Sequence, residues 1–158
     1  GYSHVLIGII QEYGLDPGYF QFEITENVAT EYSESFCTAI DDFAEVGIHM
    51  CLDDFGSGYS SEGSLLNLNV NIVKLDMELV HGIDENPDKQ ELAANLIHYC
   101  KERGILVLAE GVERIEELHA MLMLGADLFQ GYYLGRPELE IRPVNPYVVE
   151  KLRVLSQK

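Results

Sequence analysis

Short apolar segments alternate five times with longer segments whose apolar residues have helical spacing, and this alternation restricts the fold more than any other feature of the chain. Strands are predicted at residues 19–25, 48–52, 72–75, 105–109 and 128–132. Helices are predicted at residues 3–13, 33–46, 87–103, 114–124 and 146–155, with a short one through Leu65 and Leu68. Strands that alternate with helices in this way pair in parallel and are joined by crossover helices. The pattern therefore predicts an α/β fold.

Two architectures fit this pattern, an open doubly wound sheet and part of a (β/α)8 barrel. The predicted strands are apolar on both faces, which is typical of buried parallel strands. No predicted strand leads into a Gly-x-Gly-x-x-Gly turn, so the dinucleotide-binding form of the open sheet is disfavoured. The placement of polar residues favours the barrel.

Each predicted strand is apolar until its carboxyl end and then carries a polar side chain. These side chains are Glu23 and Glu26, Asp53 and Asp54, Lys74, Glu110 and Glu113, and Gln130. In a (β/α)8 barrel the carboxyl ends of the strands form the rim that carries the chemistry. Taken singly, a carboxylate at a strand end is more often a helix cap or a solvated loop residue. Five strands that deliver polar groups to one rim predict a shared pocket.

Several carboxylates in one pocket repel one another unless protons or cations neutralise them. Mg²⁺ and Mn²⁺ prefer carboxylate, amide and water oxygens, so they suit this set of side chains. The adjacent pair Asp53 and Asp54 can reach one centre only where the strand ends and turns, and Gly56, Ser57 and Gly58 can supply such a turn. Lys74 lies between apolar residues, so it is expected to be buried and to need a carboxylate partner.

The charge balance limits the kinds of partner. The chain of 158 residues has 10 Lys and Arg against 27 Asp and Glu, a formal net charge of −17. Such a surface repels nucleic-acid backbones and anionic membranes, so we expect neither DNA, RNA nor a membrane as a partner. A small phosphate ligand remains possible because a bound divalent cation reverses the local field. The acidic residues away from the strand ends are interpreted as a solvated face, and Tyr132 and Tyr133 as packing residues.

The cysteines and apolar segments indicate a cytoplasmic protein. Cys37, Cys51 and Cys100 are odd in number and widely spaced, which fits reduced thiols better than a disulfide framework or a zinc site. No apolar run approaches the ~20 residues of a membrane span. The histidines do not cluster at the spacing of metal ligands.

Five segments together resemble the EAL domain, a bacterial family that hydrolyses the second messenger cyclic di-GMP. They are Phe22-Glu23-Ile24-Thr25-Glu26, the run Leu52–Ser61 that contains Asp-Asp-Phe-Gly-Ser-Gly, Val73-Lys74-Leu75-Asp76, Ala109-Glu110-Gly111-Val112-Glu113 and Gln130-Gly131-Tyr132. Their order and spacing match from about Ser3 to Pro137. The resemblance implies a modified (β/α)8 barrel with two Mg²⁺ or Mn²⁺ ions at the carboxyl ends of the strands.

The resemblance also implies a role for each polar residue. Glu23 and Asp53 would bind the first cation, and Asp53 and Asp54 the second. Lys74 would orient or activate the attacking water, and Glu110 would act as a general base or on metal-bound water. Glu113 and Gln130 would line the site, and Glu26 would anchor the Gly-rich loop after Asp54. Cyclic di-GMP would be opened to linear pGpG by two-metal hydrolysis.

The chain departs from the family pattern at two loop positions and by an absence. Ser57 replaces the usual Thr, and Glu62 replaces an apolar residue. The Glu-Ala-Leu segment and the strand with a metal-binding Asn are not in the chain, which therefore corresponds to the last five of eight βα units. We expect residues 1–158 to be a single EAL-like domain, truncated on its N-terminal side and derived from a larger sensor protein.

Truncation has consequences for the expected function. The parent domain is expected to be a phosphodiesterase, whereas the fragment alone is expected to be inactive and to associate with a second copy or another domain of its parent. Three alternatives remain open: a non-catalytic receptor for cyclic di-GMP, a folded fragment without activity, and an unrelated metal-dependent barrel hydrolase.

Overall fold

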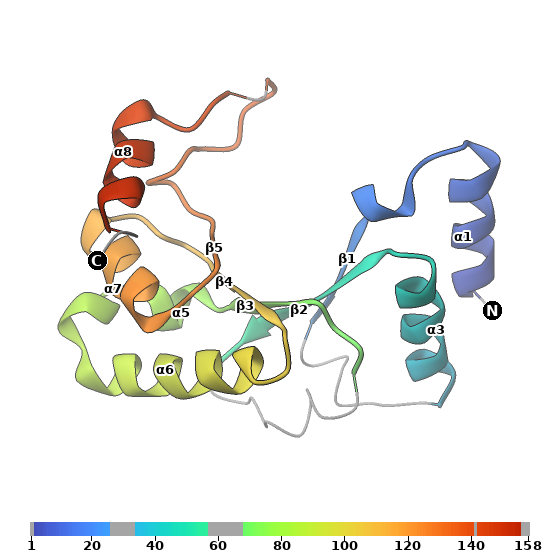
Figure 1. The fold of residues 1–158 in the computed structure, drawn as a ribbon, viewed down its shortest axis with the longest axis horizontal. Coiled ribbons are helices and arrows are strands. Elements are labelled where there is room, and N and C mark those ends of the chain that lie inside the picture. Colours follow the sequence, from blue (N-terminus) through green and yellow to red (C-terminus); the bar gives the residue numbers. More distant parts are fainter. Residues whose placement is uncertain (1, 26–33, 57–67, 141, 156–158) are drawn as a thin grey trace. The chain divides into compact units, whose positions relative to one another are not determined.

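A computed structural model describes residues 2–25, 34–56, 68–140 and 142–155. It has an α/β fold with five parallel strands whose order in the sheet follows the chain. These are β1 (Gln21–Thr25), β2 (His49–Phe55), β3 (Ile72–Leu75), β4 (Leu106–Ala109) and β5 (Leu128–Phe129) (Figure 1). The predicted fold class is confirmed.

The helices between the strands also follow the predicted alternation. They are α1 (Tyr2–Glu12), α3 (Glu34–Glu45), α5 (Met77–Val80), α6 (Pro87–Lys101), α7 (Ile115–Leu124) and α8 (Pro146–Leu155), with the 3-10 turns η1 (Pro17–Tyr19) and η2 (Ile83–Glu85). The short elements α5, η1 and η2 were not predicted, and β5 ends earlier than expected. The helix predicted through Leu65 lies outside the described residues.

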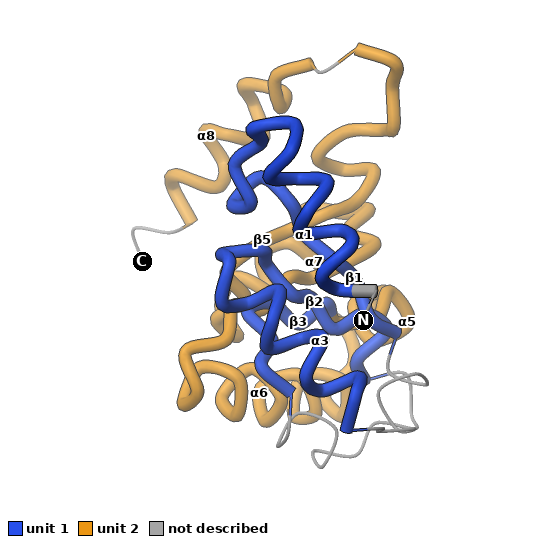
Figure 2. Tube along the Cα trace, turned by 90° about the vertical axis from the view of Figure 1, so that its right-hand side faces the viewer, with its two compact units in different colours: residues 1–74 blue, residues 75–158 orange. Residues whose placement is uncertain are grey.

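The described residues form two compact units, Gly1–Lys74 and Leu75–Lys158, so β3 spans their boundary (Figure 2). Each unit is treated by itself below. No described helix combines the length and apolar character that a bilayer crossing requires.

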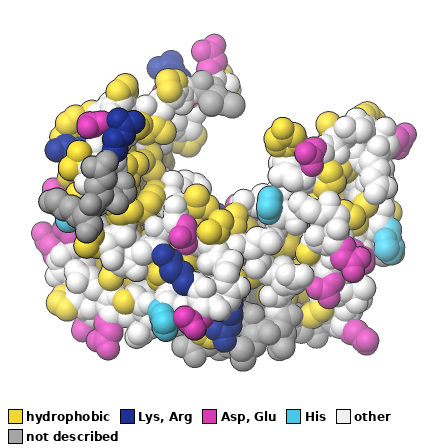
Figure 3. Space-filling view, viewed as in Figure 1, with side chains coloured by type: hydrophobic (Ala, Val, Ile, Leu, Met, Phe, Trp, Pro, Cys, Tyr) yellow, Lys and Arg dark blue, Asp and Glu magenta, His cyan; other side chains and the backbone are white. Residues whose placement is uncertain are grey.

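In the first unit, β1 and β2 pair in parallel with Gln21 opposite His49 and Thr25 opposite Asp53. Helix α3 packs on β2 and on α1, where Ser3 Oγ donates to Asp42 Oδ2 at 2.7 Å. The outer side of α3 carries acidic side chains (Figure 3). Helix α1 instead exposes apolar side chains, with Val5 62% exposed.

A side-chain bridge fixes β3 beside β2. The N–H of Met50 donates to Asn71 Oδ1 at 2.8 Å, and the N–H of Asn71 donates to the Met50 carbonyl at 2.9 Å. These bonds set the register of the segment that leads into β3. All four β3 residues are buried, including the charged Lys74.

In the second unit, β4 and β5 pair in parallel, with Leu108 opposite Leu128 and Ala109 opposite Phe129. Helix α6 packs on β4, α7 and η2. It begins at Pro87, after Asn86 caps it by accepting from the N–H groups of Asp88 and Lys89 at 3.1 Å.

Candidate active site

Lys74 is the buried cation of the first unit. It is 6% exposed, and its Nζ lies 3.0 Å from Asp53 Oδ1 and 3.4 Å from Glu23 Oε1. The predicted need of this lysine for carboxylate partners is therefore confirmed. The Asp53 side chain is 19% exposed and that of Glu23 47%, so the group faces water on one side.

The strand register explains why these side chains meet. Thr25 pairs with Asp53, and partners in parallel strands point to the same face. Glu23 precedes Thr25 by two residues, so it shares that face. Ile24 and Leu52 point the other way and are buried. The alternation of apolar and acidic residues in β1 and β2 thus directs the Glu23 and Asp53 carboxylates to one face of the sheet, where they lie beside Lys74.

Asp54 has an unusual backbone conformation, with φ of +59°, the one positive value among the described non-glycine residues. Asp tolerates this left-handed region better than most residues. The N–H of Asp54 donates to Asp53 Oδ1 at 3.0 Å, and carboxylate oxygens of the two residues lie within 4.8 Å of each other. Consecutive carboxylates in this arrangement fit a hard divalent cation, which binds oxygens at about 2.0–2.6 Å.

In the second unit, three predicted residues line one cavity of about 230 Å³. Its walls are Met77, Glu110, Gly111, Glu113, Gln130, Gly131 and Tyr132. Glu110 directly follows β4, and its N–H donates to the Leu75 carbonyl at 3.2 Å. The N–H of Gln130 donates to the Ala109 carbonyl at 2.9 Å, so both residues sit at the carboxyl ends of neighbouring strands. Glu110, Glu113 and Gln130 therefore face a common space.

A close backbone crossing supports this cavity. The Val112 N–H donates to the Gln130 carbonyl, and the Tyr133 N–H donates to the Val112 carbonyl, both at 3.0 Å. A Cβ at Gly131 would lie 2.2 Å from the Val112 carbonyl oxygen, so only glycine fits at this crossing.

Tyr132 was interpreted as a packing residue, and this interpretation is wrong. Its side chain is 53% exposed, and the guanidinium of Arg136 lies 4.5 Å from the ring centroid. The aromatic ring is therefore available at the edge of the cavity.

Not all predicted site residues fall within the described part of the chain. Glu26, Ser57, Gly58 and Glu62 lie outside it. Glu23, Asp53, Asp54 and Lys74 belong to the first unit, whereas Glu110, Glu113 and Gln130 belong to the second. The convergence of both groups on one rim stays a prediction.

Sequence reasoning missed Glu117, which it assigned to the solvated acidic face. Its side chain is only 3% exposed, in the first turn of α7. Burial alone would raise the pKa of Glu117, but hydrogen bonds from the backbone of Gly82, Glu113 and Arg114 and from the Arg114 side chain hold it below its ordinary value. Burial alone would lower the pKa of Arg114, but the Asp84 and Glu117 carboxylates raise it.

The chain matches the sequence pattern of the EAL domain over residues 2–137. It is 31% identical over 137 residues to the Escherichia coli cyclic di-GMP phosphodiesterase PdeF, covering 87% of this chain and 18% of PdeF. It also superposes on Klebsiella pneumoniae BlrP1 in a calcium and cyclic di-GMP complex, with a TM-score of 0.82 and 32% identity over 90% of this chain and 36% of that one. A manganese complex of BlrP1 gives a TM-score of 0.78 and 33% identity over 85% and 34%. The chain thus spans less than a fifth of PdeF and about a third of BlrP1.

Proposed function

The chain belongs to the EAL domain family, and we propose that it contributes the C-terminal part of a catalytic domain that hydrolyses cyclic di-GMP to linear pGpG. The observation that carries the proposal is the contact of buried Lys74 with Glu23 and Asp53, beside the left-handed Asp54. Acidic residues on a solvated surface do not require a buried lysine beside them. A hydrolytic site, in contrast, requires carboxylates and an ammonium group held in fixed positions.

The carboxylates would supply ligands for two divalent cations, Mg²⁺ or Mn²⁺. Glu23 and Asp53 would hold one, and Asp53 and Asp54 the other. When bound, the cations supply Lewis acidity and lower the pKa of bound water. The donor set is suitable because all three side chains offer carboxylate oxygen and lie within the neighbouring strands β1 and β2.

The remaining residues handle water and substrate. Lys74 Nζ, held 3.0 Å from Asp53, donates a hydrogen bond that orients the attacking water. The Glu110 carboxylate accepts the proton of that water as its oxygen bonds to phosphorus. The phosphorus bond to the ribose 3′ oxygen breaks, and that oxygen takes a proton from solvent water. Glu113 and Gln130 bind the substrate from the walls of their cavity.

The family resemblance implies that Glu26 would anchor the Gly-rich loop after Asp54. This part of the proposal rests on the family resemblance of Glu26 and the Gly56–Gly58 segment.

The test uses the protein at its natural full length, with nucleotide chromatography after incubation with cyclic di-GMP and Mn²⁺. Asp53→Asn preserves shape and removes charge, so turnover should fall by at least about 100-fold. Asp41→Asn, on the exposed side of α3, is the matched control and should leave turnover unchanged. Chelation with EDTA should abolish hydrolysis.

Two results would overturn the proposal. Calorimetric binding of cyclic di-GMP without turnover would identify a receptor, which is the principal alternative. Hydrolysis by Asp53→Asn at the parental rate would remove Asp53 from the chemistry. The 158-residue chain alone should show negligible hydrolysis, because its described residues form five strands whereas a (β/α)8 barrel has eight.

A further inference from the structure

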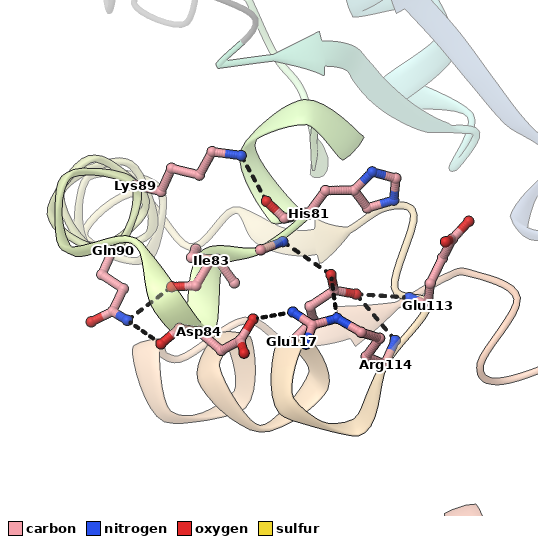
Figure 4. Close-up of polar contacts among 9 residues, drawn as sticks. His81, Ile83, Asp84, Lys89, Gln90, Glu113, Arg114 and Glu117 are labelled. Carbon is pink, nitrogen blue, oxygen red and sulfur yellow. Dashed lines mark hydrogen bonds and ion pairs between the residues drawn. The ribbon is translucent and has the colours of Figure 1, made fainter.

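The Glu117 carboxylate accepts hydrogen bonds from two separate backbone segments, one at Gly82 and the other at Glu113 and Arg114 (Figure 4). Oε1 accepts from the N–H of Gly82 at 3.0 Å and from Arg114 Nε at 3.3 Å. Oε2 accepts from the N–H groups of Glu113 at 3.0 Å and Arg114 at 3.1 Å. A single buried carboxylate therefore joins the loop Glu110–Arg114, termed here the site loop, to the turn His81–Asp84.

The turn to which Glu117 ties the site loop is itself fixed by α6. Lys89 Nζ donates to the His81 carbonyl, and Gln90 Nε2 donates to the Ile83 carbonyl at 2.8 Å and the Asp84 carbonyl at 3.3 Å (Figure 4). Lys89 Nζ also donates to the Glu78 carbonyl. Because α6 packs on β4 and α7, these bonds connect the turn to the strand and helix of the second unit and make it a support for the site loop.

The opposite end of the site loop is also seated on this support. Gly111 has φ of +68°, and a Cβ there would lie 2.6 Å from Met77 Cβ and 3.3 Å from His81 Nε2. The loop therefore approaches Met77 of α5 and His81 of the turn as closely as glycine allows. Between Gly111 and Arg114 the backbone has little freedom to shift.

The side chains carried by the site loop point to the reason for this arrangement. Glu110 and Glu113 line the cavity that also contains Gln130. A catalytic base and a substrate-binding group need positions accurate to a fraction of an ångström, and a 1 Å error can cost about 100-fold in rate. Backbone hydrogen bonds to a buried carboxylate provide that accuracy, because they are charge-assisted and shielded from water.

We propose that Glu117 is a positioning residue, whose carboxylate holds the site loop on the turn His81–Asp84 so that Glu110 and Glu113 face the substrate. This inference rests on the proposed phosphodiesterase function for its catalytic consequence. Its structural part, the tethering of the Glu113 and Arg114 amides, is independent of any activity.

The test compares Glu117→Gln with Glu116→Gln in the full-length protein. Both variants lose one negative charge from the first turn of α7, but the Glu116 side chain is exposed and serves as the matched control. A glutamine side chain in place of Glu117 has a single acceptor oxygen for four donors, so amide hydrogen exchange at Glu113 and Arg114 should accelerate at least about tenfold. The kcat for cyclic di-GMP should fall by about 10- to 100-fold because Glu110 is misplaced, and KM should rise as well because Glu113 binds the substrate in the proposed function.

Asp84→Asn provides a milder second variant, because it weakens only the outer ion pair with Arg114 Nη2, 2.5 Å away. It should accelerate exchange less than Glu117→Gln and lower kcat by a smaller factor. If Glu117→Gln does not fold, Asp84→Asn is compared with Glu116→Gln, and equal exchange and equal kcat in these two variants refute the proposal.

The measurements separate the two claims. An inactive wild-type protein refutes the proposed function. In that case amide hydrogen exchange at Glu113 and Arg114 still tests whether the Glu117 carboxylate holds the site loop. An active wild type with equal kcat in the Glu117→Gln and Glu116→Gln variants refutes the positioning role. Unchanged exchange at both amides in Glu117→Gln refutes the tether itself. A rise in KM without a fall in kcat also overturns the proposal, since it would indicate a role in binding alone.

Discussion

Replacement of Gly131 by alanine tests how tightly two segments of the second unit cross. A Cβ at this position would lie 2.2 Å from the Val112 carbonyl oxygen and 2.3 Å from the Val112 nitrogen. These are backbone atoms, so no side-chain rotation relieves the overlap and the segments must separate. Overpacking of this kind costs about 1–3 kcal/mol. Separation also stretches the two hydrogen bonds between Val112 and the Gln130–Tyr133 segment, worth about 1 kcal/mol each.

The expected loss in the free energy of unfolding is therefore about 3–5 kcal/mol for Gly131→Ala. Gly135→Ala is the control, because a Cβ there meets nothing within 4 Å, and its effect should stay within about 0.5 kcal/mol. Urea unfolding and native-state exchange of the Val112 and Tyr133 amides measure both effects. A Gly131→Ala protein with wild-type stability and wild-type exchange at these amides would show that the crossing is looser than described.

Three other changes test separate parts of the structure. Lys74→Met leaves two carboxylates without their cation and should cost about 2–3 kcal/mol in urea unfolding, less than a fully buried pair because Glu23 is half exposed; a change under about 0.5 kcal/mol would contradict this. The pKa of Glu117 is lower in the folded protein than its ordinary value of 4.5. The contribution of the ionised carboxylate to the free energy of unfolding is therefore complete above pH 4.5 and is lost as the pH falls through the folded-state pKa. The stability advantage of wild type over Glu117→Gln should therefore shrink on acidification, and a pH-independent difference would refute it. Burial raises the pKa of Cys100 to about 11, so at pH 8 only about one thiol in a thousand is ionised, and iodoacetamide should label half-buried Cys37 first by peptide mass spectrometry.

Local sequence patterns were sufficient to predict structure where the burial of a residue follows from its immediate neighbours in the chain. Lys74 lies between Val73 and Leu75 in a strand with no polar face, so its burial and its need for carboxylates could be predicted. The bounds of β3, residues 72–75, were predicted for the same reason. The alternation of strands and helices was long enough to fix the α/β class.

Contacts between distant segments could not be predicted in this way. Glu117 looks like a solvated first-turn carboxylate, and only the turn around Gly82, 35 residues earlier, makes it buried. One local signal was available, because Glu117 stands three residues after the helix cap Arg114, the spacing at which a side chain reaches back to the cap. Helix α5 is too short for apolar periodicity, although the cap Asp76 marks its start.

The end of β5 shows a similar limit. The strand was expected to reach residue 132, but the backbone leaves the ladder after Phe129. Gln130 then pairs with Val112 instead of continuing the strand, because Gly131 allows the close crossing. An apolar and aromatic run predicts extended backbone, yet it does not indicate which segment that backbone will contact.

The left-handed backbone at Asp54 bears on how proteins of this kind can diverge. Asn and Gly are the residues that accept such a conformation most readily, and each is one nucleotide change away from an Asp codon. Either replacement removes a carboxylate while leaving the turn undisturbed. Under the proposed function, a substitution at this codon would remove catalysis without unfolding the protein, and a lineage could then keep a ligand-binding shape after losing turnover.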